Sequence, residues 1–118
     1  MRACALLVCL GLLAACGPEQ PREVSLADLA FAMAEHDGAL VETVGVVRAF
    51  TEAEDDALRD HFVIEDDAQN RVELVPHDAV AGYVGEQVRV VGRFTVDDGR
   101  LLEVDAITPE ERPADLAR

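Results

Sequence analysis

Alternating hydrophobic and polar positions begin at residue 40 and continue through most of the chain. The stretch from Leu40 to Phe50 is rich in β-branched residues and is interrupted near its middle by Gly45. Such a run predicts a buried strand, and a glycine inside a strand usually marks a bulge or a tight bend. We therefore expect this stretch to be the bent first strand of a small barrel.

A hairpin is predicted next. Residues 61–66 and 71–76 both alternate between apolar and polar side chains, and residues 67–70 provide a turn between them. A period of two is typical of half-buried strands. The apolar face of this hairpin is expected to contain Phe62, Ile64, Val72 and Leu74. Residues 77–83 are expected to form a short connecting helix.

The last two strands lie on either side of residues 97–99 (DDG). A two-residue turn would set Phe94 opposite Glu103 and mix the apolar and polar faces, because a slip of one residue reverses every side chain. A three-residue turn pairs Phe94 with Leu102 and Arg93 with Glu103. We therefore predict the three-residue turn, with the glycine in a left-handed conformation.

One helix is predicted before the first strand, at residues 24–36. Ser25 is a suitable N-cap with Asp28 three residues later, and Val24 is placed to pack on Leu29 as a hydrophobic staple. The apolar stripe of this helix consists of Leu26, Leu29, Ala30 and Met33. A short helix with a single apolar stripe is expected to pack that stripe against another part of the domain. We expect it to cover an open edge or end of the barrel.

The composition of the chain limits the classes of function that are plausible for it. The chain has 118 residues, which allow one domain, and its formal net charge is -14. All ten basic residues are arginine. A surface of this sign repels phosphates, and a chain with no tryptophan and one tyrosine offers few rings for stacking bases. Binding of single-stranded nucleic acid is therefore disfavoured.

The first sixteen residues, MRACALLVCLGLLAAC, have an arginine followed by an apolar core that is too short to cross a bilayer. The end of this stretch, Leu13-Ala14-Ala15-Cys16, resembles the lipobox of bacterial lipoproteins. That resemblance implies cleavage before Cys16 and lipidation of its sulfur. An ordinary cleaved signal with an incidental cysteine, or a buried N-terminal helix, remains the alternative.

Lipidation would account for the cysteines, since Cys4 and Cys9 leave with the signal and no thiol remains for a disulfide or a metal. The mature chain would carry nine arginines against 24 carboxylates. The resemblance implies a lipid anchor in the cell envelope. With Gly17 in place of an aspartate, the expected site is the outer membrane facing the periplasm in a Gram-negative cell, and otherwise the outer face of the plasma membrane.

The order of predicted elements, a long bent strand, a hairpin, a short helix and a second hairpin, is that of the OB-fold, a five-stranded Greek-key barrel. The chain resembles the small exported OB-fold proteins of bacteria, including the tRNA anti-like domains of lipoproteins. The residues that carry the resemblance are Val41, Gly45, Val47, Phe62 to Asp66, Val72 to Leu74, Gly85, Val88, Val90, Gly92 and Val104 to Ile107. A sandwich or an SH3-like barrel is the rival architecture.

Four segments are therefore expected along the chain. They are a signal peptide at residues 1–15, a lipidated cysteine and tether at 16–23, a mainly β OB-fold domain with its extra N-terminal helix at 24–109, and a flexible tail at 110–118. Residues 51–60 (TEAEDDALRD) interrupt the strand pattern. We expect them to form a solvated acidic loop between the first and second strands.

OB-folds typically bind on the face of their second and third strands and on two flanking loops. In this chain that region is expected to contain Glu52, Glu54, Asp55, Asp56, Asp60, His61, Glu65, Arg71 and Glu73. This set of side chains favours a protein or a cationic partner. We therefore expect a binding module with no cofactor.

Two other functions compete with this one. The acidic loop with His61 could hold a metal ion, but it lacks the glycine and distal glutamate of an EF-hand loop. His36, in the last turn of the predicted helix, and His77, at the start of the connecting helix, are interpreted as structural. The chain contains no Ser-His-Asp or Cys-His arrangement, P-loop or HExxH sequence. We therefore do not expect an enzyme.

Overall fold

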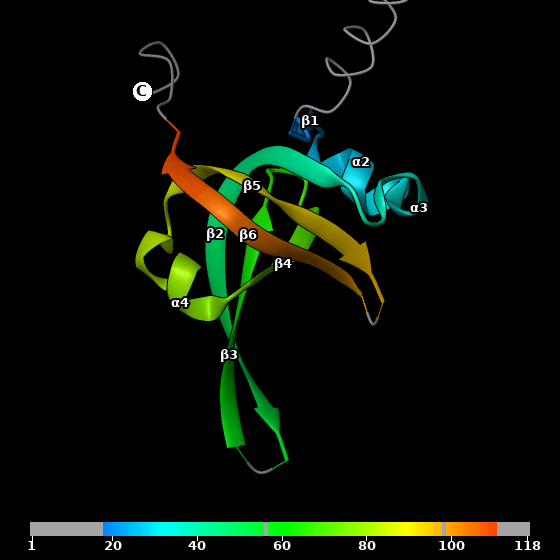
Figure 1. Cartoon of the computed structure of the whole chain (residues 1–118). Helices are drawn as coiled ribbons and strands as arrows, with labels where there is room; N and C mark the ends of the chain where they lie inside the picture. Colours follow the sequence, from blue (N-terminus) through cyan, green and yellow to red (C-terminus); the bar gives the residue numbers. More distant parts are fainter. Residues whose placement is uncertain (1–17, 56, 98, 111–118) are drawn as a thin grey trace, which may run out of the picture.

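Six strands form one mixed sheet within residues 18–55, 57–97 and 99–110, which are the residues that the computed structural model describes. Short helices lie before the second strand and between the fourth and fifth (Figure 1). The elements in chain order are β1 (Arg22–Glu23), α2 (Leu26–Phe31), α3 (Met33–His36), β2 (Leu40–Glu54), β3 (Ala57–Glu65), β4 (Arg71–Val75), α4 (His77–Val80), the 3-10 helix η1 (Ala81–Tyr83), β5 (Gln87–Val96) and β6 (Arg100–Pro109).

The strand pairings close on themselves. The sheet runs β1-β2-β3-β4-β6-β5, and β2 also pairs with β5. Five strands, β2, β3, β4, β6 and β5, therefore form a ring in which only the β4–β6 pair is parallel. The predicted count of five strands omits β1, which pairs in parallel with β2 through Arg22 and Glu23. Those two residues belong to the segment predicted as a tether.

Strand β2 changes partner at Val46, directly after Gly45. Residues 40–46 pair with β5, and residues 46–54 pair with β3. Figure 1 shows β2 curving around the top of the sheet and then descending beside β3. A Cβ atom at Gly45 would lie 2.8 Å from the Glu65 carbonyl oxygen, from Ile64 and from Leu26. Glycine therefore lets the end of β3 and helix α2 approach the bend, as the sequence predicted for this position.

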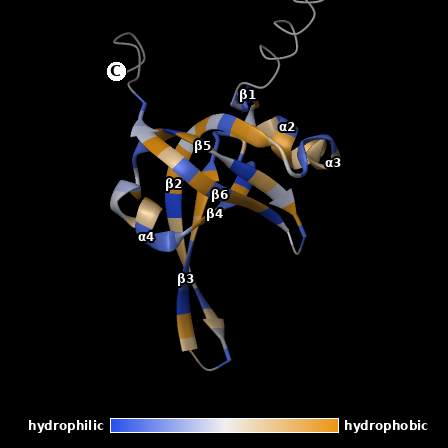
Figure 2. Cartoon of the chain, in the orientation of Figure 1, coloured by the Kyte–Doolittle hydropathy of each residue, from blue (hydrophilic) through white to orange (hydrophobic). Residues whose placement is uncertain are grey.

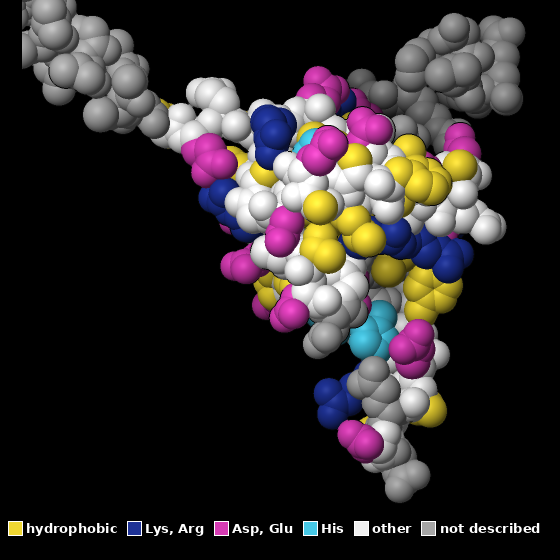
Figure 3. Space-filling view, turned by 90° about the vertical axis from the view of Figure 1, so that its right-hand side faces the viewer, with side chains coloured by type: hydrophobic (Ala, Val, Ile, Leu, Met, Phe, Trp, Pro, Cys, Tyr) yellow, Lys and Arg dark blue, Asp and Glu magenta, His cyan; other side chains and the backbone are white. Residues whose placement is uncertain are grey.

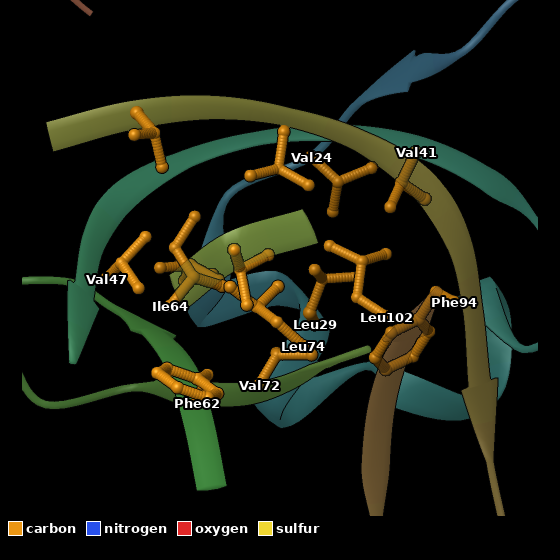
Figure 4. Close-up of a cluster of buried hydrophobic side chains, with 14 residues drawn as sticks. Val24, Leu29, Val41, Val47, Phe62, Ile64, Val72, Leu74, Phe94 and Leu102 are labelled. Carbon is orange, nitrogen blue, oxygen red and sulfur yellow. The ribbon is translucent and has the colours of Figure 1, made fainter. Parts of the chain in front are cut away.

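The core lies inside this ring of strands (Figure 4). Strands β3, β4 and β5 alternate between buried and partly exposed positions, which is visible as alternating colour along the strands in Figure 2. Leu29 of α2 is fully buried with them. The predicted apolar face of the first hairpin is confirmed, since its buried side chains are Phe62, Ile64, Val72 and Leu74.

The register of the second hairpin is also confirmed. Phe94 pairs with Leu102 and Arg93 with Glu103, so three residues, 97–99, form the turn. Gly99 has a positive φ of 139°. A bulge between Val91 and Gly92, which was not predicted from the sequence, shifts the register further along this hairpin. A Cβ atom at Gly92 would lie 2.3 Å from the Glu103 carbonyl oxygen, so the bulge requires a glycine.

The prediction of a loop at residues 51–60 is wrong. Strands β2 and β3 continue to pair through this segment, from Thr51 opposite Asp60 to Glu54 opposite Ala57. The result is a two-stranded ribbon that projects from the body of the domain (Figure 1). Its described side chains between residues 50 and 60 are exposed. Because neither face of the ribbon packs on a core, no alternation marks it as a strand pair.

The predicted single helix is divided in two. Ser25 caps α2 as expected, because its hydroxyl accepts a hydrogen bond from the Asp28 amide at 3.1 Å. Ala32 leaves the helical conformation, with φ -116° and ψ 38°, and α3 begins at the next residue. Met33 is consequently exposed instead of completing the apolar stripe, and Phe31 is 84% exposed.

Arg89 of β5 holds several segments together. Its guanidinium lies 2.9 Å from the Glu42 carboxylate of β2 and 2.8 Å from that of Glu110. Glu23 of β1 lies 3.7 Å away. Burial lowers the pKa of Arg89, but the hydrogen bond to Glu42 and the charge of Glu110 raise it by a larger amount, so the net shift of the pKa is upward. The arginine therefore stays charged and joins β1, β2 and the end of β6.

The lipobox at Leu13–Cys16 and residues 111–118 of the expected tail lie outside the described residues. Glu110, the first residue of that tail, donates its amide to the Gln87 carbonyl at 2.8 Å. Among the described helices, none has the length and the apolar character needed to cross a membrane.

Candidate binding face

The side chains of the β2–β3 ribbon divide between two faces. Paired residues in an antiparallel ladder lie on the same face, and successive residues lie on opposite faces. One face carries the pairs Phe50 with His61 and Glu52 with Arg59. The other face, which continues the inner side of the sheet, carries Thr51 with Asp60 and Ala53 with Leu58. We call the first the strand face, because it continues onto the outer side of β3 and β4.

Glu65 is the centre of the charges on the strand face. Its carboxylate accepts a hydrogen bond from Arg71 Nε and lies 3.5 Å from Arg48 Nε. The Glu65 side chain is only 13% exposed. The Arg71 guanidinium also lies over the Phe50 ring, 5.0 Å from its centroid, which is a cation–π distance. Both of these arginines are therefore already engaged by a carboxylate.

His61 lies between two carboxylates. Its Nε2 is 3.7 Å from Glu52 and its Nδ1 is 4.0 Å from Glu73. The His77 ring packs edge-on against Phe62, with ring centroids 5.3 Å apart, and lies 6.3 Å from the His61 ring. The His61 ring therefore links the β2–β3 ribbon to β4 on the strand face.

A hollow of about 270 Å³ adjoins the strand face beside β4. It lies between that strand and the turn of the β5–β6 hairpin. Carboxylates of Glu73 and Asp97 line it together with the arginine side chain of residue 100. The remaining lining residues are Thr95, Gly99 and Leu101. The hollow therefore extends the strand face toward the second of the two loops where a ligand was expected.

The structure brings five of the predicted binding residues onto the strand face, namely Glu52, His61, Glu65, Arg71 and Glu73. Asp60 lies on the opposite face, where its carboxylate accepts a hydrogen bond from the Thr51 hydroxyl at 2.8 Å. Asp55 is exposed at the ribbon turn with a φ of 48°. Glu54 is the last residue of β2, and Asp56 lies outside the described residues.

Sequence reasoning missed Arg48 and Phe50, which the strand face includes. Continuing the alternation of β2 past residue 47 would have found both, because they share the parity of Glu52. Within residues 18–55, 57–97 and 99–110, no three histidine, aspartate or glutamate side chains are grouped to hold a metal ion. The metal alternative therefore gains no support from the residues that the structure describes.

No protein-family model matches the chain, and no curated protein matches it either. Solved structures do resemble it. A chain of the Stn1–Ten1 complex of S. pombe has a TM-score of 0.55 and 15% sequence identity, and the match covers 86% of this chain and 87% of that one. The telomere capping protein Ten1 from Saccharomyces pombe has a TM-score of 0.52 and 17% identity over 76% of this chain and 81% of its own.

A DUF3299 family protein of Pseudomonas aeruginosa is more distant, with a TM-score of 0.48 and 16% identity over 80% of this chain and 99% of its own, too low to support an inference. At these identities the first two similarities concern the fold alone. Together with the ring of strand pairings, they support an OB-fold domain.

Proposed function

We propose that this chain is a lipid-anchored, non-enzymatic OB-fold module of the bacterial cell envelope that binds a positively charged segment of a partner protein. The closed barrel would present the strand face and the projecting ribbon as its binding surface. Cys16 would carry the lipid, and the short segment before β1 would keep this surface near the membrane.

The charge of the ribbon is the observation that carries this proposal. Residues 51–60 contain five carboxylates and one arginine. On the adjoining strand face, Arg48 and Arg71 are engaged by Glu65, whereas Glu52 and Glu73 make long contacts to His61. Figure 3 shows the ribbon as a narrow projection that carries both acidic and basic side chains. A cationic segment would be attracted to the ribbon, because residues 51–60 carry a net charge of -4, five carboxylates against one arginine.

The similar structures support a binding module, since one is a complex between two proteins. Another is named a telomere capping protein, and OB-folds as a class bind oligonucleotides, so single-stranded nucleic acid is the second candidate ligand. The charge of this chain opposes that second candidate, because a phosphate backbone would meet carboxylates where binding requires cations.

Titration calorimetry of the full chain with a decalysine peptide, a decaglutamate peptide and a fifteen-residue oligothymidine tests the proposal. We expect binding of decalysine alone, weakening as salt is raised. The variant Glu52→Gln/Glu73→Gln should bind several-fold more weakly. The matched control Glu35→Gln/Asp105→Asn changes the net charge equally, at exposed positions away from the strand face, and should bind like the parent. Equal weakening by both variants, or tight binding of the oligothymidine, would contradict the proposal.

The anchor has a separate test. Mass spectrometry of the mature protein from cell envelopes should find an N-terminal fragment that begins with a lipid-modified Cys16. An unmodified cysteine or cleavage at another position would remove the lipid from the proposal and leave the binding surface unaffected.

A further inference from the structure

The outer edge of β2 is open along the projecting ribbon. Beyond residue 46, β2 pairs with β3 on one side, and its other side has no strand partner among the described residues. The Val47 amide and carbonyl point to that outer side, because they bond to the Glu86 carbonyl at 3.1 Å and to the Gly85 amide at 2.8 Å.

Backbone direction alternates along a strand, and the β2–β3 register runs without a bulge from residue 46 to residue 54. The amides and carbonyls of Ala49, Thr51 and Ala53 therefore point to the same outer side as those of Val47. Such a row of backbone groups is a template for another strand.

Small and apolar side chains lie on one face of this edge, and a carboxylate lies on the other. Ala49, Thr51 and Ala53 place small side chains on one face, and Leu58 of the neighbouring strand extends that face with a side chain that is 78% exposed. Glu52 lies on the opposite face, where its carboxylate is 65% exposed. Val84, which forms a parallel bridge to Val47 at the body end of the edge, is 45% exposed.

We infer that the β2 edge at Ala49–Ala53 receives an extended peptide segment with alternating basic and apolar side chains, which adds a strand to the ribbon. This inference rests on the proposed function and specifies its mode of binding. Alternation places the basic side chains beside Glu52 and the apolar ones over Ala53 and Leu58. Five residues of edge correspond to about 17 Å of strand at about 3.4 Å per residue.

A second copy of this chain is a poor occupant for the same edge. Pairing two ribbons would bring together two segments that each contain five carboxylates and one arginine, and like charges placed opposite one another destabilise a sheet. The acidic residues therefore exclude self-pairing and at the same time select a cationic strand.

The test uses two acetylated hexapeptides of equal composition, one alternating lysine and valine and one with three lysines followed by three valines. We expect the alternating peptide to bind the full chain about tenfold more tightly, which corresponds to about 1.4 kcal/mol. Hydrogen exchange should slow at the amides of Ala49, Thr51 and Ala53 when it binds. Equal binding of both peptides without this protection overturns the edge inference and leaves the charge-based function intact, whereas no binding of either peptide contradicts both.

Single substitutions test whether the peptide binds to the outer edge of β2. Thr51→Pro removes an amide that points outward, so it should weaken the alternating peptide about tenfold while the ladder to β3 persists. Thr51→Val keeps the amide but removes the hydroxyl that bonds Asp60, so it separates loss of the backbone donor from loss of that hydrogen bond and should bind more tightly than Thr51→Pro. Circular dichroism checks that each variant folds, and the exchange measurement on the parent chain decides the matter if a proline variant does not. If Thr51→Pro bound the alternating peptide as tightly as the parent, the inference that the peptide pairs with the β2 edge would be refuted.

Discussion

Replacing Gly45 by alanine tests whether the ring of strands depends on close approach at one point. The added methyl group would lie 2.8 Å from the Glu65 carbonyl oxygen, from Ile64 Cγ1 and from Leu26 Cδ1. Leu26 and Ile64 are buried, so their side chains have little room to move away. The Glu65 oxygen belongs to the backbone where β3 meets β2, so its displacement would disturb the pairing of Val46 with Glu65.

The expected size of the effect combines two opposing contributions. Overpacking a well-filled core costs about 1–3 kcal/mol, and contact with a backbone atom places this site in the upper part of that range. Alanine also reduces the freedom of the unfolded chain, which stabilises by about 0.4–1 kcal/mol. We therefore expect a net loss of about 2 kcal/mol and a melting temperature lower by roughly 8–16 °C for a domain of this size.

Gly82→Ala is the matched control, since nothing lies within 4 Å of the position that its added methyl group would take and its φ is not positive. It should leave the free energy of unfolding unchanged or raise it by about 0.5 kcal/mol. Urea unfolding and thermal melts of both variants, followed by circular dichroism, make the comparison. If Gly45→Ala melts within about 2 °C of Gly82→Ala, the close approach is not needed for the fold, and the reasoning about the bend fails.

Three further substitutions test other parts of the structure. Gly92→Ala should cost about 3 kcal/mol or more by urea unfolding, since its methyl group would meet the Glu103 carbonyl oxygen at 2.3 Å, and a loss below about 1 kcal/mol would contradict the bulge. Thr43→Val should stabilise by about 1 kcal/mol, because the buried Thr43 hydroxyl has no hydrogen-bond partner among the described residues; destabilisation would show that it has one in solution. Burial raises the pKa of Asp66, but hydrogen bonds from Asn70 and from the Ala68 amide lower it by a larger amount, so the net shift is downward. The ionised carboxylate therefore stabilises the fold above about pH 4, and this stabilisation is lost as the pH falls through the lowered pKa. The destabilisation caused by Asp66→Asn, measured by urea unfolding, should therefore be about 1 kcal/mol at about pH 7 and smaller at about pH 3, and an equal value at both would refute this.

The strands that surround the core were predictable from the sequence because burial imposes a period of two. In β3 and β4, Phe62, Ile64, Val72 and Leu74 fall on one side, and the structure buries those side chains. Matching faces also predicted the register of the β5–β6 hairpin, in which Phe94 meets Leu102. The bulge at Gly92 was missed, although an isolated glycine within a strand was a usable signal for it.

The ribbon and β1 were not predictable from periodicity for the opposite reason. The described side chains of residues 51–60 are exposed on both faces, so the polar and apolar ones are not sorted by packing. Strand β1 has only two residues, Arg22 and Glu23, both exposed, and it exists because it pairs with the start of β2. The candidate binding residues could therefore be named from the sequence, but five of the nine were assigned to a loop, although two of these, Glu52 and Asp60, lie on opposite faces of the β2–β3 ladder.

The carboxylates of the chain have two different roles, depending on where the fold places them. Several carboxylates hold the fold together: Glu42 and Glu110 bind Arg89, Glu65 binds Arg48 and Arg71, and Glu19 binds Arg93 at 3.1 Å. These pairs engage arginines of the body, so they contribute little to the excess negative charge. Part of the excess lies on the ribbon, since residues 51–60 hold five carboxylates and one arginine and so contribute -4 to the net charge of -14. An open strand edge that consisted of apolar residues alone would pair with copies of itself. An edge bordered by more carboxylates than arginines resists that pairing and favours a cationic strand, so the residues that protect the ribbon are also those that would select its partner.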